Sequence, residues 1–165
     1  MDWRTLFIIL HILGTIFGVA GATFALAFSR KAQSDGNIDA SEGALLGITY
    51  TFLRTGLILI VLSGFGLLIY TRLTEHAQYL YSIRLWLKLT ITTVLLLNTI
   101  ALMAKRIPGW ISHAISLVGW YAAFIIGAWR GYHWSYLTGI VALAILTLMV
   151  GFILKRTDVA KHMHA

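Results

Sequence analysis

Five long apolar stretches, separated by short polar segments, constrain the fold of this chain more than any other feature. Each is close to the roughly 20 apolar residues that a helix needs to cross a bilayer. Backbone polar groups in lipid must bond to one another, so each stretch is expected to be a helix. The sequence therefore predicts an all-α, polytopic transmembrane bundle, forming a single integral membrane domain over 1–165 with spans at 5–28, 45–70, 85–104, 110–129 and 134–154.

Composition supports a membrane protein and excludes several kinds of site. The chain is 59% hydrophobic with a mean hydropathy of +0.82, well above the usage of soluble domains. It has no cysteine, which excludes disulfides, thiolate nucleophiles and cysteine-ligated zinc or iron–sulfur sites. The first apolar run is longer than the apolar core of a secretory signal, so we expect it to remain as a span.

The net charge of +7 reflects membrane topology rather than nucleic-acid binding, because the basic residues lie mostly at span ends. Five spans place the two termini on opposite sides. Cytoplasmic loops carry the larger share of Lys and Arg, so we expect the N-terminus outside and the C-terminus in the cytoplasm. The larger set is Arg30, Lys31, Lys105, Arg106, Lys155, Arg156 and Lys161, against Arg4, Arg72, Arg84 and Arg130.

The first span contains a single ionisable residue, His11. Gly14, Gly18 and Ala22 follow it on the same helical face, since a helix repeats every 3.6 residues. Gly14 and Gly18 form a G-x-x-x-G pair, which allows a neighbouring helix to approach closely. We therefore expect His11 to point into the bundle and small residues, including Gly56, to form the helix contacts.

Two interpretations of His11 remain open. It is either a neutral imidazole that bonds to a Ser or Thr of a neighbouring helix, or an axial ligand of haem iron and thus a metal-binding residue. A haem with two His ligands would need a second histidine at the same depth. Under the predicted topology His113 lies in the other half of the bilayer and His133 lies near the surface.

Arg54 and Lys88 lie within predicted spans, whereas all acidic residues lie outside them. A charged residue within a span is costly, so it needs a partner or a route to water. Either both side chains extend to the lipid headgroups, or an anionic group outside the protein pairs with them. Haem propionates, a quinone headgroup and a lipid phosphate are the candidate anions.

The polar loop from Asp35 to Glu42 resembles the second half of an EF-hand calcium loop, with Gly36 and Asp39 in the matching places. The first ligand position would be Lys31, which removes a carboxylate and adds a positive charge. The alternative is a turn followed by a helix start, in which Asp39 and Glu42 form a capping box.

Several short motifs carry a resemblance to known families. They are Leu10-His11-Ile12, Gly18-Val-Ala-Gly-Ala-Thr23, Asp35-Gly-Asn-Ile38, Leu62-Ser-Gly-Phe-Gly66 and Trp86-Leu-Lys-Leu89. Together they resemble a group of small multi-pass proteins of bacterial genomes. His11 and Lys88 also give a weaker resemblance to the HemJ-type protoporphyrinogen oxidases and related copper-resistance membrane proteins. That resemblance implies haem b at His11, although Asn98-Thr99-Ile100 stands where the family has a further His.

These observations predict a protein of the bacterial inner membrane that holds haem b or a quinone for electron transfer, without covalent catalysis. His11, Lys88 and Arg54 are the predicted cofactor-binding residues. The alternative is a non-enzymatic membrane subunit or small-solute permease whose polar residues only join helices. Expected partners are the lipid bilayer and a second copy or a membrane subunit, but not nucleic acid.

Overall fold

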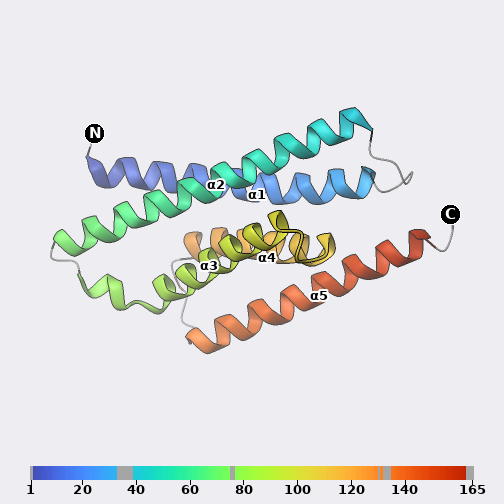
Figure 1. Cartoon of the computed structure of the whole chain (residues 1–165). Coiled ribbons are helices and arrows are strands. Elements are labelled where there is room, and N and C mark those ends of the chain that lie inside the picture. Colours follow the sequence, from blue (N-terminus) through green and yellow to red (C-terminus); the bar gives the residue numbers. More distant parts are fainter. Residues whose placement is uncertain (1, 33–38, 75–76, 130, 132–134, 163–165) are drawn as a thin grey trace.

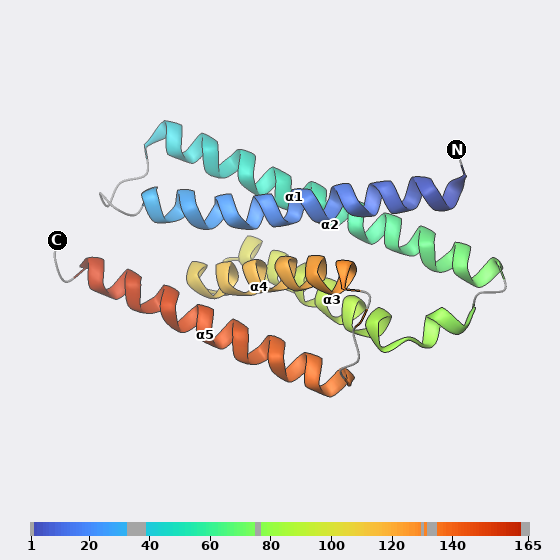
Figure 2. The same cartoon turned by 180° about the vertical axis from the view of Figure 1, so that it is seen from behind.

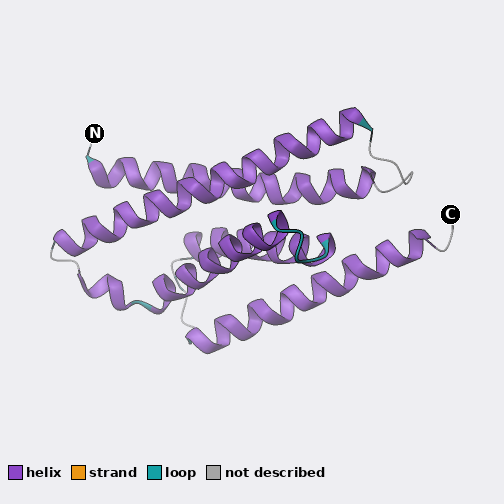
Figure 3. Cartoon of the chain, in the orientation of Figure 1, coloured by secondary structure: helices purple, strands orange, loops and turns teal. Residues whose placement is uncertain are grey.

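The computed structural model describes residues 2–32, 39–74, 77–129, 131 and 135–162, and every regular element in these ranges is a helix (Figure 3). Five of the described helices are long and apolar enough to cross a membrane, which confirms the predicted fold class. The elements are α1 (Trp3–Ala32), α2 (Ala40–Leu73), the short 3-10 helix η1 (Ala77–Tyr81), α3 (Ile83–Met103), α4 (Gly109–Ala128) and α5 (Tyr136–His162).

Three helices extend beyond the predicted apolar runs. α1 continues to Ala32, α2 begins at Ala40, and α5 continues to His162. The N-terminus of α2 is fixed by Asp39, which forms a capping box with Glu42, as the sequence predicts. Hydropathy locates only the part of a helix that crosses lipid. Backbone hydrogen bonding continues into the polar residues that follow, so these helices are longer than their apolar segments.

The helices form two layers and one flanking helix. α1 and α2 are antiparallel and lie side by side, and they form the first layer (Figures 1 and 2). α3 and α4 form the second layer, which contacts the first mainly between α1 and α4. α5 packs on the outside of the second layer, chiefly against α4. The chain thus crosses the bundle five times, and α1 begins at the opposite end from the end of α5 (Figure 1).

Glycines bring α1, α2 and α4 into close contact. A Cβ built at Gly56 would lie 2.8 Å from the backbone oxygen of Gly14 and 2.8 Å from the backbone nitrogen of Gly18. A Cβ at Gly18 would overlap the indole ring of Trp120. The predicted small-residue face of the first span is therefore the place where the two layers meet.

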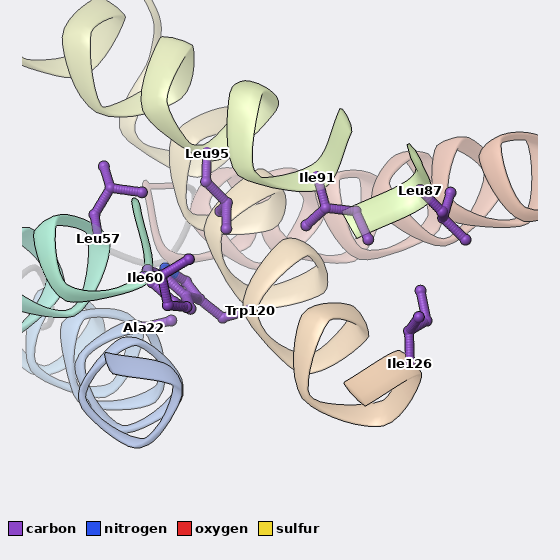
Figure 4. Close-up of a cluster of buried hydrophobic side chains, with 8 residues drawn as sticks. All are labelled: Ala22, Leu57, Ile60, Leu87, Ile91, Leu95, Trp120 and Ile126. Carbon is purple, nitrogen blue, oxygen red and sulfur yellow. The ribbon is translucent and has the colours of Figure 1, made fainter. Parts of the chain in front are cut away.

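The buried side chains form one cluster between the layers, and most other large apolar side chains face outward. Trp120 is only 2% exposed and lies beside Ile60 and Ala22 (Figure 4). Across the most apolar 18 residues of each span, at most 22% of the residues are buried. Such an apolar exterior suits lipid and not water, so these features are those of a multi-pass membrane protein.

Candidate functional site

His11 joins α1 to α2 through a hydrogen bond with Ser63. The two atoms are His11 Nδ1 and Ser63 Oγ, 3.0 Å apart. Ser63 is only 1% exposed and His11 is half-buried, as the close approach of α1 and α2 at Gly56 requires. The imidazole therefore points into the bundle and has the hydroxyl partner that one interpretation of the sequence predicted.

The hydrogen bonds of Ser63 fix the tautomer of His11. The Ser63 hydroxyl lies 2.5 Å from the carbonyl oxygen of Leu59, which can only accept a hydrogen bond. The single hydroxyl proton is donated there, so the Ser63 oxygen accepts from His11 and Nδ1 carries the imidazole proton. A buried charge in an apolar span is costly, which favours the neutral imidazole, and in that form Nε2 keeps a lone pair. Space remains beside the ring, since a Cβ built at Gly64 would meet only His11 Cε1, at 3.8 Å.

Lys88 of α3 is the charged residue whose electrostatic field acts on the His11 imidazole. Lys88 is half-buried and forms no hydrogen bond or ion pair with any residue that the structure describes. Arg84, one turn earlier, has a structural partner: its Nη2 donates to the carbonyl oxygen of Ile126 at 3.0 Å. That carbonyl lies in the last turn of α4, where a cation complements the helix dipole. Among the described residues, Lys88 is therefore a half-buried cation without a partner in this half of the bundle.

His11 and Lys88 lie at similar depth. His11 is eight residues after Trp3 and Lys88 five residues after Ile83, and α1 and α3 begin at the same end of the bundle (Figure 1). At 1.5 Å per residue these positions are about 12 and 8 Å from the helix starts. Arg54 does not join them. It lines a cavity in the other half, beside Asn98, so the three predicted binding residues form two separate sites.

A second histidine makes a matching bond at the opposite end. His113 Nε2 of α4 lies 3.0 Å from Ser29 Oγ of α1. Ser29 is near the C-terminal end of α1, and His113 is four residues after the start of α4. His113 is therefore far along the bundle from His11, as the sequence predicts, and is not placed to share a haem with it.

No group of three or more His, Cys, Asp or Glu side chains that could hold a metal ion occurs among the described residues. His133 and residues 33–38, which include the first half of the calcium-like loop, lie outside the described residues. Asp39 and Glu42 belong to the described half of that loop, and Asp39 serves there as the N-cap of α2.

Sequence reasoning missed four polar residues that the structure brings into these sites. Ser63 and Arg84 support the half that contains His11, whereas Ser112 and Ser116 bond to Asn98 in the other half. A small hydroxyl residue in an apolar span was the available signal for Ser63 and Ser116, whereas Ser112 contributes its backbone carbonyl, which no residue type marks. Periodicity alone does not indicate which of the many span hydroxyls faces which helix.

A comparison of the chain with protein-family models, curated proteins and solved structures finds no match. The resemblance to small bacterial multi-pass proteins and to the HemJ-type oxidases therefore stays a prediction.

Proposed function

We propose that the protein is a membrane electron-transfer module that binds a quinone, or its quinol, against His11 and Lys88. The supporting observation is the orientation of His11, whose Nδ1 bonds to Ser63, so that Nε2 of the neutral imidazole would carry a lone pair. That lone pair would accept a hydrogen bond from a quinol hydroxyl, and the Lys88 ammonium would donate to the second oxygen. Gly64 has no side chain, so the ring would approach the imidazole from that side.

Haem b is the second candidate, because an unprotonated Nε2 is also the atom that ligates haem iron. Lys88, whose field acts on His11, would then meet a propionate. The described residues offer no second histidine in this half of the bundle. A quinone headgroup is smaller than a porphyrin and its tail remains in lipid, so the quinone suits the site better.

We also propose where the site lies in the membrane. The protein would lie in the bacterial inner membrane with its N-terminus outside, which places His11 and Lys88 in the outer half. A second copy or a membrane partner subunit would exchange electrons with the cofactor. A C-terminal reporter that is active only outside the cytoplasm would contradict this orientation.

The test measures quinone binding to the purified full-length protein in lipid nanodiscs, by quenching of tryptophan fluorescence with a soluble quinone analogue. His11→Ala and Lys88→Met should each weaken binding by about tenfold or more, since each removes a hydrogen bond in a low-dielectric site. Gly64→Leu leaves both groups intact but fills the space beside the imidazole, so it should also weaken binding. His113→Ala is the matched control and should bind as the unmodified protein does.

The same preparations separate the two cofactors. A Soret band after reconstitution with haem, lost in His11→Ala and kept in His113→Ala, would assign the site to haem instead. Equal quinone binding in His11→Ala and His113→Ala, together with no haem spectrum, would overturn the proposal. The polar residues would then only join helices, as in a non-enzymatic membrane subunit.

A further inference from the structure

A cavity of about 40 Å³ lies where α2, α3 and α4 meet, in the half of the bundle away from His11. Most of its polar lining comes from side chains that the site at His11 does not use. The polar lining residues are Tyr50, Arg54, Asn98, Thr99, Ser112 and Ser116. Space of this size holds one small polar group rather than a whole solute.

Asn98 lines this cavity and has a buried acceptor without a hydrogen-bond partner among the described residues. The side chain is only 5% exposed, and its Nδ2 donates to the carbonyl oxygen of Ser112 at 3.2 Å and to Ser116 Oγ at 3.0 Å. The Ser112 carbonyl can only accept, which fixes the amide orientation and leaves Oδ1 on the other side. Oδ1 has no hydrogen-bond partner among the described residues. Buried acceptors normally have one, so this atom calls for a donor from outside the chain.

Arg54 supplies the opposite requirement at the same cavity. Its side chain is exposed on α2 and forms no hydrogen bond or ion pair within the part of the chain that the structure describes. A guanidinium within an apolar helix needs an anion or water, and its planar fork matches the oxygens of a phosphate. The cavity therefore combines a cation that lacks an anion with an acceptor that lacks a donor.

The cavity lies close to one end of the bundle. Asn98 is five residues before the end of α3 and Ser112 three residues after the start of α4. The short connection between these helices carries Lys105 and Arg106. The cavity is thus within about 8 Å of that basic turn along the helices, at 1.5 Å per residue. A lipid headgroup bound at that turn would lie within reach of the cavity.

Lys105 adds a conformational observation to the charge. It has a φ of 54°, the left-handed region where glycine usually ends a helix. The turn has the hydrogen bonds of such an ending, from Lys105 N to the Leu102 oxygen and from Arg106 N to the Ala101 oxygen, both 2.9 Å. Glycine would adopt this conformation without the backbone strain that lysine has here. The lysine, however, adds a cation near the cavity.

We propose that this cavity binds the headgroup of an anionic phospholipid that also carries hydroxyl groups. The phosphate would pair with Arg54 and a headgroup hydroxyl would enter the cavity and donate to Asn98 Oδ1. The small volume and the exposed position of Arg54 favour a lipid, because only the tip of the headgroup fits inside and the acyl chains remain outside the bundle. Basic pockets between membrane helices bind such headgroups in general.

The test uses native mass spectrometry of the full-length protein with phosphatidylglycerol or phosphatidylcholine. Phosphatidylglycerol should bind at least about tenfold more tightly, as expected for a charge-assisted pair. Arg54→Gln should remove this preference. Arg72→Gln, a change of an exposed arginine at the other end of the same helix, should keep it. Asn98→Asp places a negative charge in the wall and should also remove the preference.

Two further measurements distinguish the source of the ligand and guard against misfolding. Inorganic phosphate and glycerol phosphate should compete only weakly with the lipid; competition at equal concentration would overturn the assignment to a lipid. Lys105→Gly should raise the melting temperature while lowering phosphatidylglycerol affinity, a combination that a misfolded variant cannot give. Equal binding of the two lipids, or equal preference in Arg54→Gln and Arg72→Gln, would overturn the proposal. None of these outcomes depends on quinone binding at His11.

Discussion

The two His–Ser pairs of this bundle have the same length, but they use different nitrogens of the imidazole. In each pair a serine hydroxyl donates to a carbonyl of its own helix, Leu59 for Ser63 and Leu26 for Ser29. Each serine therefore accepts from its histidine. The nitrogen that donates to the serine is Nδ1 in His11 and Nε2 in His113, so we expect the two neutral imidazoles to be opposite tautomers.

The comparison also shows how α1 is held at both ends. His11 bonds α1 to α2 in one half, and Ser29 bonds the same helix to α4 in the other half. At His11 the field of a second cation, Lys88, also acts on the imidazole. A buried histidine with a hydroxyl partner joins helices at both ends of α1, so such a pair is not evidence of function by itself.

The largest effect is expected from Gly56→Val, which would separate α1 from α2 near the first pair. The added side chain would meet backbone atoms of Gly14 and Gly18, which cannot move independently of their helix. Overpacking of this kind costs about 3 kcal/mol. A denaturant titration of the purified protein should show that loss of unfolding free energy, together with loss of the His11–Ser63 bond.

Gly47→Val in the same helix is the control, because a Cβ at Gly47 has no atom within 4 Å. Similar losses for the two variants would mean that valine acts through the helix itself and not through the contact between α1 and α2.

Ser63→Ala and Ser29→Ala should have the next largest effects, and they test the two pairs directly. Each removes one hydrogen bond between helices, which costs about 1 kcal/mol in membrane proteins. Imidazole ¹⁵N spectra of the unmodified protein should show the proton on Nδ1 in His11 and on Nε2 in His113. Ser63→Ala should release the tautomer of His11 alone, and Ser29→Ala that of His113 alone. A shared tautomer in the unmodified protein would contradict the hydrogen-bond directions given above.

The sequence predicts the parts of this structure that depend on one helix at a time. Apolar length locates the spans, helical period places His11 with Gly14 and Gly18, and Asp39 with Glu42 marks a helix start. Contacts between helices are not predicted in this way, because the helical period of 3.6 residues identifies a face but not the helix that covers it. The pairing of His11 with Ser63 therefore required the fold.

The same reason explains the separation of the predicted binding residues. Arg54 and Lys88 share a chemical argument, a cation in lipid without an acid, and that argument does not depend on position in three dimensions. The cavity at Asn98 arises only where α2, α3 and α4 meet. The orphaned Oδ1 of Asn98 depends on the position of one carbonyl in α4, which no local pattern encodes.

The smallest effect is an acid sensitivity confined to the end of the bundle that carries the His113–Ser29 pair. There Asp39 caps α2, and the backbone N–H of Glu42 and the Ser41 hydroxyl lower the pKa of Asp39 from its usual 3.8. A lowered folded-state pKa means that the carboxylate stabilises the helix start fully above the unfolded value. This contribution is lost as the pH falls below 3.8 and through the folded pKa.

Amide exchange of Glu42 and Gly43 should therefore gain speed, relative to the unfolded chain, as the pH falls through that range. Asp39→Asn caps a helix equally well without titrating, so it should abolish this pH dependence while the protection at neutral pH stays close to that of the unmodified protein. The amides around His11 in α1 and Ser63 in α2 lie toward the other end of the bundle and should not respond in either protein. An identical pH response in Asp39→Asn would assign the acid sensitivity to another group and remove this difference between the two ends.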